Sequence, residues 1–180
     1  IEGEIPIEAL ASKAPVYDRK WIKKNPNKSK FDLKNFKKIK IEDALIKILS
    51  SPNYSNKDWI TNQYDQMVMC DTAQKSGSDA AIIRIHNKDK AIAISVDSSA
   101  NYCKSFPLTG GKQIVCENWR NLITVGAKPL AITNCLNFGN PENEEIMGEF
   151  AECLQGIKEA CEFLNYPVVS GNVSFYNGTN

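Results

Sequence analysis

The chain has 180 residues, a length that suits one domain or one domain with an extension. Hydrophobic residues make up 42% of it, as in an ordinary globular protein, and no apolar run approaches the roughly 20 residues that span a bilayer. The formal net charge is +1. Charge and composition therefore indicate neither a nucleic-acid partner nor a membrane protein.

The termini and the cysteines indicate a cytoplasmic protein. The N-terminus has neither the basic start nor the apolar core of a signal peptide, and it lacks an initiator Met, so we expect a portion of a longer chain. A zinc site needs close pairs of ligands, but no CxxC spacing occurs and His86 is the single histidine. We expect six reduced, partly buried thiols: Cys70, Cys103, Cys116, Cys135, Cys153 and Cys161.

Residues 1–58 are predicted to form an extended arm with one short helix. Pro6, Pro15 and Pro26 interrupt any helix in the first 40 residues. Apolar residues then recur at helical spacing over residues 41–49, with acidic residues in the first turn, where the helix dipole favours them.

The arm is also the basic part of the chain. Residues 1–60 hold 13 Lys and Arg against 8 Asp and Glu. Only Trp21, Phe31 and Phe36 accompany the lysines, which is a poor pattern for stacking on nucleic-acid bases. A solvated linker is the favoured interpretation, and contact with RNA or DNA is the alternative.

Residues 59–180 are predicted to form a mixed α/β (α+β) domain, with helices packed on one face of a mixed sheet. A polar loop is expected at residues 97–101, after the hairpin. The predicted order is hairpin, helix, strand, long helix and strand, over residues 80–85 and 91–96, 110–124, 130–136, 143–164 and 167–169.

Two polar, glycine-containing segments, residues 133–140 and 170–174, come at the predicted ends of strands. Ligands collect at the carboxyl ends of strands in open α/β sheets. Glycine lets backbone N–H groups approach an anion, and Asn and Ser are neutral ligands for phosphate or magnesium. The same residues form ordinary turns, however, so the pattern alone leaves a ligand role undecided.

Other residues carry weaker signals. Gly110-Gly111 before a helix is a candidate phosphate nest, although a turn is the better interpretation. The carboxylates Asp65, Asp71 and Asp97 are candidates for a metal but more typical of solvated or capping groups. No Ser-His-Asp arrangement is indicated, and a Cys–His pair, which would need His86, is disfavoured.

Longer strings carry a specific resemblance. They are residues 63–68, 110–112, 120–129, 133–141 and 170–177. Together they resemble phosphoribosylformylglycinamidine synthase, in its synthetase subunit, a family similar in fold to aminoimidazole ribonucleotide synthetase. The resemblance covers roughly residues 60–180 and implies the N-terminal domain of the second of two homologous halves. Residues 5–10 and 14–17 look like the connection between those halves.

The resemblance implies a ligase of purine biosynthesis. The family converts formylglycinamide ribonucleotide, ATP and glutamine-derived ammonia into the amidine, with Mg2+ as the metal. Its general-base His and most carboxylate ligands of magnesium belong to the first half, so this chain is expected to supply part of a site and to be inactive alone. Expected partners are the remaining domains, a glutaminase subunit, a small accessory subunit and, through an unpaired sheet face, a second copy.

Four positions match the family's binding residues. The resemblance implies that Asn134 and Gly171 contact ATP, that Asn172 binds magnesium and that Ser174 binds the ribonucleotide; it implies no catalytic residue. Asn134 stands where the family has Asp or Asn, so an acceptor is kept and a charge is absent. A further departure lies at residues 97–101, where relatives often carry glycines and an Arg.

Two alternatives stay open. The domain is also interpretable as a structural module that pairs with the other half of the enzyme. Another member of the superfamily, such as aminoimidazole ribonucleotide synthetase itself, is a second alternative, which the strings at residues 134–140 and 170–174 disfavour.

Overall fold

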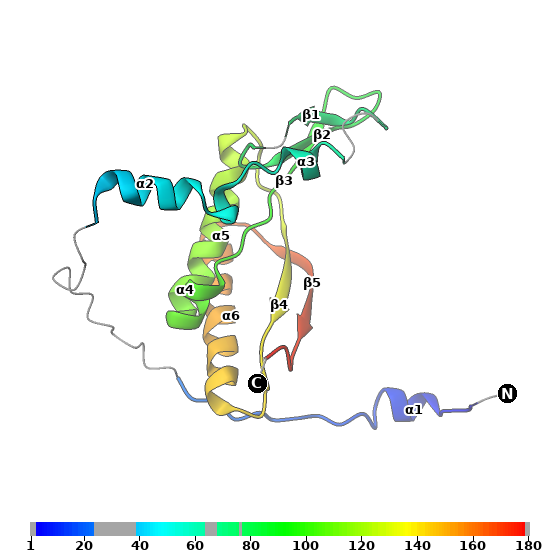
Figure 1. Ribbon diagram of the computed structural model, residues 1–180. Helices are drawn as coiled ribbons and strands as arrows, with labels where there is room; N and C mark the ends of the chain where they lie inside the picture. Colours follow the sequence, from blue (N-terminus) through cyan, green and yellow to red (C-terminus); the bar gives the residue numbers. More distant parts are fainter. Residues whose placement is uncertain (1–2, 24–38, 64–67, 76, 179–180) are drawn as a thin grey trace.

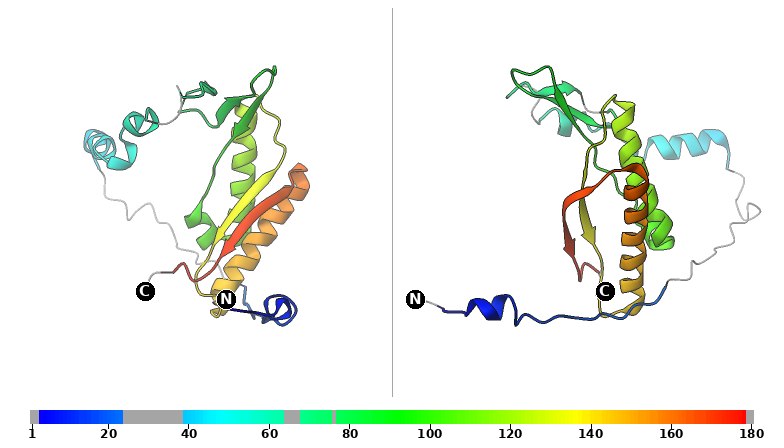
Figure 2. Two further views of the ribbon diagram at one scale, coloured as in Figure 1. Left: turned by 90° about the vertical axis from the view of Figure 1, so that its right-hand side faces the viewer. Right: turned by 180° about the vertical axis from the view of Figure 1, so that it is seen from behind.

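A computed structural model describes residues 3–23, 39–63, 68–75 and 77–178 (Figure 1). Its central layer is a pair of long helices, α5 (Pro107–Thr124) and α6 (Glu144–Leu164). They cover one face of a parallel strand pair, β4 (Ile132–Asn137) and β5 (Val168–Ser174), as the turned views in Figure 2 show. The predicted mixed α/β class, with helices on one face of a sheet, is confirmed.

The remaining strands form a second, antiparallel sheet. The predicted hairpin is present as β2 (Ala81–Arg84) and β3 (Ala91–Ile94), in register from Ala81 opposite Ile94 to Arg84 opposite Ala91. A strand that the sequence did not indicate, β1 (Thr72–Gln74), pairs with β2. The strands of the described residues therefore divide between two sheets, of three and two strands.

Local signals at the ends of the long helices agree with the structure. Asn143 is the N-cap of α6, and its side-chain oxygen accepts hydrogen bonds from the N–H groups of Glu145 and Ile146 at 2.9 and 3.3 Å. Gly126 follows the C-cap of α5 with a φ of 78°, in the left-handed region that glycine adopts without a steric penalty. These caps position the helices against β4 and β5.

The hydrophobic core lies between the helix pair and the strands. Val115 and Leu122 of α5, Ile157 of α6 and Leu136 of β4 are all buried in it. The largest fully buried side chain is Tyr166, which is 2% exposed and follows α6. Burial raises the pKa of its hydroxyl, and that hydroxyl donates a hydrogen bond of 2.7 Å to Asn118.

The helices approach closely because glycines line their contact. A Cβ on Gly156 would overlap the carbonyl oxygen of Leu108 and lie 3.2 Å from the backbone nitrogen of Lys112. A Cβ on Gly111 would likewise overlap the carbonyl oxygen of Cys153. The backbones of α5 and α6 are in direct contact at both positions. The two helices can lie this close only because glycine has no side chain.

The arm contains more helical elements than the one short helix that was predicted, and it contacts the domain. Its elements are α1 (Ile7–Leu10), the predicted helix α2 (Ile41–Leu49), the 3-10 turn η2 (Pro52–Tyr54) and α3 (Asp58–Thr61). The arm crosses the start of α6, where the N–H of Ile22 donates to the carbonyl of Glu144 at 3.1 Å. Much of the lysine-rich stretch, residues 24–38, lies outside the described residues. The predicted boundary between residues 58 and 59 falls inside α3 and stays a prediction.

Two predicted loops differ from the structure. The strand predicted at residues 167–169 continues to Ser174, so the segment 170–174 is strand and not loop. The polar segment 97–101 runs into a short helix, α4 (Ala100–Ser105). Both segments are rich in turn-forming residues (Asp, Asn and Ser in 97–101, Gly, Asn and Ser in 170–174), whose turn preference is overridden here by packing on α5 and α6 and by pairing with β4, respectively. Among the described residues, no helix has both the length and the apolar character needed to cross a membrane.

Candidate functional site

The four residues predicted to bind ligands lie on the parallel strand pair. Asn134 of β4 is opposite Gly171 of β5, Cys135 is opposite Asn172, and Asn137 is opposite Ser174. Two segments 37 residues apart in sequence are thus joined in one register, which the separate motifs did not indicate.

The register divides these residues between two faces of the strand pair. Successive side chains of a strand point to opposite faces, and opposed residues share a face. Leu136 is buried towards the helices, so Asn134 and Gly171 belong to the helix-side face. Asn172 and Ser174 belong to the open face. Within the described residues β5 has no strand on its outer side, so its edge is unpaired.

Gly171 is required by the packing of Asn134. A Cβ at position 171 would overlap the side-chain oxygen of Asn134 and would lie 2.6 Å from its backbone oxygen. Such distances exclude any side chain larger than hydrogen. The backbone of Gly171, which is exposed, is left bare for contact with a ligand.

The loops that follow the two strands are tied to each other. Phe138 N–H donates to the Ser174 carbonyl at 2.9 Å, and Tyr176 N–H donates to the Gly139 carbonyl at 3.0 Å. The amide of Asn177 donates to the Ser174 hydroxyl at 3.0 Å and to the Phe138 carbonyl at 3.3 Å. Ser174 is therefore held in place by a residue for which the motifs indicated no role.

An aromatic cluster fixes this end of the strands to α6. Phe150 of α6 makes edge-to-face contacts with Phe138 and with Phe175, with ring centroids 5.2 and 5.1 Å apart. Gly139 packs against Ile146 in the first turns of α6, since a Cβ there would lie 3.1 Å from its Cδ1 atom. The carboxyl ends of both strands are thus a rigid platform.

Residues 77–180, which include this platform and its helices, match a family described as AIR synthase related protein, N-terminal domain. The chain belongs to the AIR synthase related family. The resemblance that the motifs carried is confirmed by individual relatives. Phosphoribosylformylglycinamidine synthase subunit PurL of Pelagibacter ubique is 62% identical over 178 residues, and the same subunit of Bartonella quintana is 48% identical over 178 residues.

Solved structures agree with the AIR synthase related fold. The structure of PurLQS from Thermotoga maritima is 32% identical and superposes with a TM-score of 0.70 over 98% of this chain. T. maritima PurL complexed with ATP is 31% identical, with a TM-score of 0.68. The chain spans 24% of the length of both PurL relatives and 27% of the PurLQS chain.

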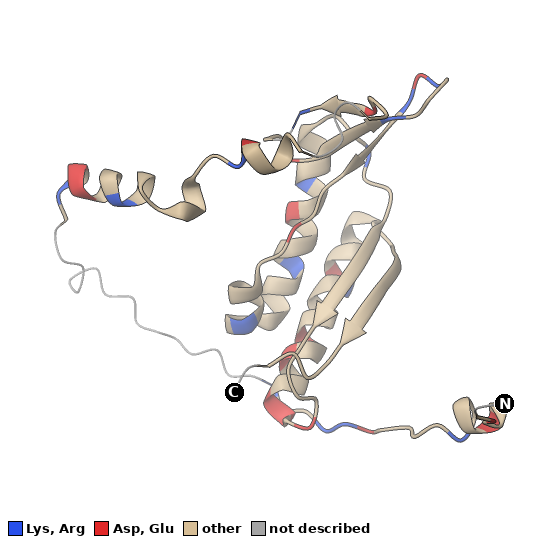
Figure 3. Ribbon diagram, turned by 45° about the vertical axis from the view of Figure 1, so that its right-hand side comes forward, with Lys and Arg blue, Asp and Glu red and all other residues tan. Residues whose placement is uncertain are grey.

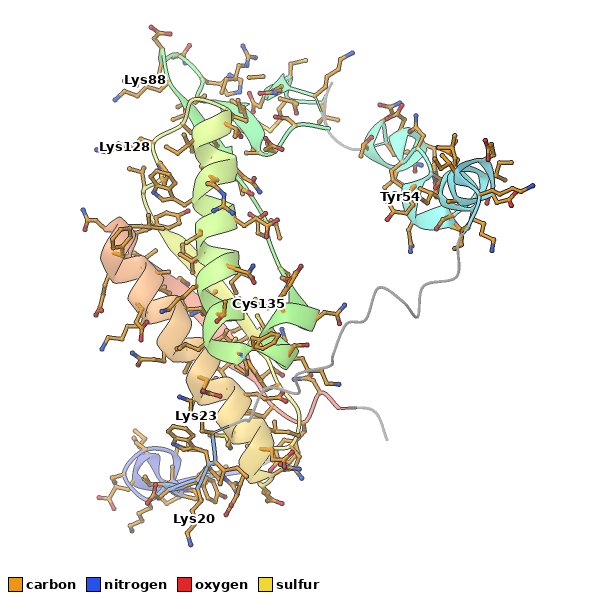
Figure 4. The ribbon with its side chains drawn as sticks, turned by 90° about the vertical axis from the view of Figure 1, so that its left-hand side faces the viewer. Lys20, Lys23, Tyr54, Lys88, Lys128 and Cys135 are labelled. Atoms are coloured by element: carbon orange, nitrogen blue, oxygen red, sulfur yellow. The ribbon has the colours of Figure 1, made fainter. Side chains whose placement is uncertain are left out.

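Strands β4 and β5 contain no charged residue, and Figure 3 draws both of them in tan. Positive charge approaches from the arm, whose Lys20 and Lys23 lie beside the base of α6, while Cys135 lies on β4 (Figure 4). Arg19 contacts Glu142 at 3.6 Å, and Lys23 contacts the buried Glu152 at 3.9 Å. The arm therefore brings cations to the end of the domain at which β4 and β5 finish.

The donor set of the strands fits a magnesium ion held only in part by this chain. Mg2+ takes oxygen ligands and keeps several waters, often with substrate phosphates. Asn172 supplies an exposed amide oxygen on the open face. In the part of the chain that the structure describes, no cluster of three His, Cys, Asp or Glu residues is placed to hold a metal. The ligands that β4 and β5 themselves offer to such an ion are neutral.

The weaker candidates are placed elsewhere. Gly110 and Gly111 lie inside α5, buried against backbone, so both the favoured turn and the weaker alternative, a phosphate nest before a helix, are wrong. Asp97 accepts hydrogen bonds from Ser95, Asn118 and Asn121. This carboxylate connects β3 to α5 and has the structural role that the sequence favoured.

The other acidic candidates are far from the strand pair in the fold or lie outside the description. Asp71 precedes β1, forms an ion pair with Arg84 at 3.4 Å and contacts the Nε2 atom of His86 on the antiparallel sheet. His86 thus pairs with a carboxylate and not with a thiol. Asp65 and most of the string at residues 63–68 lie outside the described residues.

The sequence analysis missed two contributors to the site. Asn177 ends the string 170–177, so its position in the motif was visible, although its bond to Ser174 was not. Asn137 donates to the sulfur of Cys135 at 3.3 Å on the open face. Each lies in a segment that already contains several Asn residues. That local enrichment in amides is the only feature of the sequence that points to either residue.

Proposed function

We propose that the chain is the part of a phosphoribosylformylglycinamidine synthase that forms one wall of its ATP, magnesium and ribonucleotide site. The observation that carries the proposal is the register of β4 and β5, in which four motif residues meet on one uncharged strand pair. The PurL relatives and the ATP complex of T. maritima PurL support the same assignment. The reaction would be the ATP-dependent amidination of formylglycinamide ribonucleotide with glutamine-derived ammonia.

Asn134 and Gly171 are proposed to contact ATP. Gly171 offers exposed backbone groups that no side chain covers, and Asn134 fills the space beside it. Neutral backbone and amide groups orient a nucleotide without adding charge. This polar surface would position ATP, and the charges that neutralise its phosphates would come from cations and from other parts of the enzyme.

Asn172 is proposed as a magnesium ligand and Ser174 as a contact of the ribonucleotide. A bound magnesium ion would neutralise charge on the phosphates of ATP during transfer. Asn172 would hold the ion through its amide oxygen. Ser174, whose hydroxyl accepts a hydrogen bond from Asn177, keeps its own proton available to donate to the substrate.

The chain is proposed to be inactive alone. The His86 ring contacts Asp71 at the antiparallel sheet, away from the motif residues on β4 and β5. The sequence contains no other histidine that could act as a general base. The proposed partners are the remaining domains of the enzyme, the glutaminase subunit and the small accessory subunit, in the cytoplasm.

The test compares variants in the complete enzyme that contains this chain. Asn172→Ala should lower kcat/KM for amidine formation by about 100-fold or more, because a ligand of a catalytic ion is lost. Asn53→Ala, an exposed amide in η2, is the matched control and should retain full activity. Equal activity of both variants, or catalysis by the isolated chain, would refute the assignment.

A second candidate function, a structural pairing domain, is favoured by apolar residues on and beside the strand pair. Val169 is 69% exposed, Val173 is 52% exposed, and Leu130 before β4 is 72% exposed. An exposed apolar surface of this kind is typical of an interface with another domain or with a second copy. If Val173→Asp abolishes assembly of the enzyme while Asn172→Ala leaves activity unchanged, the structural role is the better description.

A further inference from the structure

Three helices bring two cysteines together. Cys103 lies on α4 and Cys153 on α6, and both backbones press against the consecutive glycines Gly110 and Gly111 of α5. A Cβ on Gly110 would lie 2.6 Å from the Cα of Cys103, and a Cβ on Gly111 would overlap the carbonyl oxygen of Cys153. Because these two glycines have no side chain, α4 and α6 pack closely against the same turn of α5. Each of the two helices places one cysteine at this contact.

The two thiols differ in exposure. The Cys153 side chain is 3% exposed, whereas that of Cys103 is partly exposed. Hydrogen bonding to Cys153 lowers the pKa of Cys103 to about 7, against the opposing effect of burial. The same interaction, with burial, raises the pKa of Cys153. The close packing of α4 and α6 on one turn of α5 therefore brings together a partly exposed, thiolate-forming cysteine and a buried one.

We propose that Cys103 and Cys153 are a redox-modification site, at which a hydroperoxide converts the two thiols into an intramolecular disulfide. The inference does not depend on the proposed function, because neither cysteine belongs to the strand pair that carries the candidate site.

The chemistry has two steps. The Cys103 thiolate attacks one peroxide oxygen, the O–O bond breaks, and the leaving alkoxide takes up a proton to become an alcohol. Cys103 is then a sulfenic acid. The Cys153 sulfur attacks the Cys103 sulfur, the S–O bond breaks, and hydroxide leaves with the Cys153 proton as water. Two thiols and one hydroperoxide give one disulfide, one alcohol and one water.

The other cysteines are natural internal controls. Cys135 is exposed and accepts a hydrogen bond from the Asn137 amide. Cys116 and Cys161 lie near enough for Cys116 to add to the effect of burial in raising the pKa of Cys161. Burial is the larger cause at Cys161, so the pKa of that thiol is raised and not lowered.

The experiment maps disulfides in the full chain after brief treatment with hydrogen peroxide. Free thiols are alkylated, the chain is digested without reductant, and linked peptides are identified by mass spectrometry. We expect the Cys103 and Cys153 peptides to be linked, with the loss of two hydrogen atoms. This link should form about tenfold faster than any other link, since thiolate content and proximity both favour it. Dithiothreitol should reverse it.

Two variants and one condition complete the design. Cys103→Ser at the partly exposed position and Cys153→Ala at the buried one should each abolish the link. In denaturant the preference for this pair should vanish, because the fold no longer selects among six cysteines. The oxidised chain should also melt roughly 5 °C or more above the reduced chain, since the disulfide joins α4 to α6.

The proposal is overturned if peroxide modifies Cys135 while Cys103 and Cys153 both remain free for alkylation. It is equally overturned if Cys116 and Cys161 become the linked pair in the folded chain.

Discussion

The two sheets of this domain differ in charge and in what supports them. The antiparallel sheet has an ion pair between Asp71 and Arg84 with His86 in contact with Asp71, and its hairpin turn holds further charges. The parallel pair β4 and β5 has no charged residue and rests on the α5–α6 layer. The motif residues lie on the neutral pair. A search for clustered ionisable groups would therefore lead to the antiparallel sheet and away from the motif residues, which offer amides, a hydroxyl and bare backbone.

The largest effect should come from Gly171→Ala on the parallel pair. The added Cβ would meet the backbone oxygen of Asn134 at 2.6 Å, so the strands must shift their register or separate. We expect a loss of about 3 kcal/mol in the free energy of unfolding, measured by urea denaturation.

Gly178→Ala is the matched control, because a Cβ there meets nothing within 4 Å. In the complete enzyme, Gly171→Ala should also weaken ATP binding, as isothermal titration would measure. Wild-type stability of Gly171→Ala would mean that the close approach of Asn134 is not required.

The next effect tests the helix layer beneath the same strands. Gly156→Ala places a Cβ against the backbone of Leu108 and Lys112, and these atoms cannot move without separating the helices. We expect a loss of about 1–2 kcal/mol, in which the steric cost exceeds the gain of up to about 1 kcal/mol in helix propensity. Thermal unfolding measures it. Gln113→Ala, on an exposed face of α5, should be neutral; if both variants behave alike, the glycine contact is unimportant.

A smaller effect is expected from Asn177→Ala. The variant removes the hydrogen bonds to Ser174 and Phe138 but keeps the backbone N–H of Asn177, which also donates to Phe138. The expected loss is about 1 kcal/mol of stability. In the complete enzyme the Ser174 hydroxyl would be less ordered, so KM for the ribonucleotide should rise more than kcat falls. An unchanged KM would indicate that Asn177 does not position Ser174.

The smallest effect should be on the antiparallel sheet. Asp71→Asn keeps the side-chain shape and removes a charge in contact with two half-exposed partners, Arg84 and His86. We expect at most about 1 kcal/mol of lost stability and no change in the activity of the complete enzyme. A large loss of activity would place chemistry on the charged sheet and would contradict the contrast between the two sheets.

Elements with strong local signals could be predicted from the sequence. The amphipathic spacing of Ile41–Leu49 defined α2, Asn143 marked the start of α6, and Gly126 marked the end of α5. Each depends on contacts within a few residues, which the sequence displays directly.

Features that depend on distant contacts were missed. The turn-forming residues of 170–174 hid the continuation of β5, because its pairing with β4 is invisible in either segment alone. The same holds for Cys103 and Cys153, which are 50 positions apart and have no motif spacing. The motif residues were found by family resemblance, while their division between two faces required the register.

The packing of the arm on α6 shows what holds the base of the candidate site in place. A Cβ on Gly148 would overlap the carbonyl oxygen of Ile22, so the arm lies directly on the helix backbone, one or two turns from its start. The loop that joins β4 to α6 begins at that same end. Residues 19–23 of the arm thus hold the base of the candidate site, because Ile22 packs on the α6 backbone while Arg19 and Lys23 pair with Glu142 and Glu152. A protease that cuts before residue 19 would leave these contacts in place, whereas removal of residues 19–23 would loosen the platform without touching any motif residue.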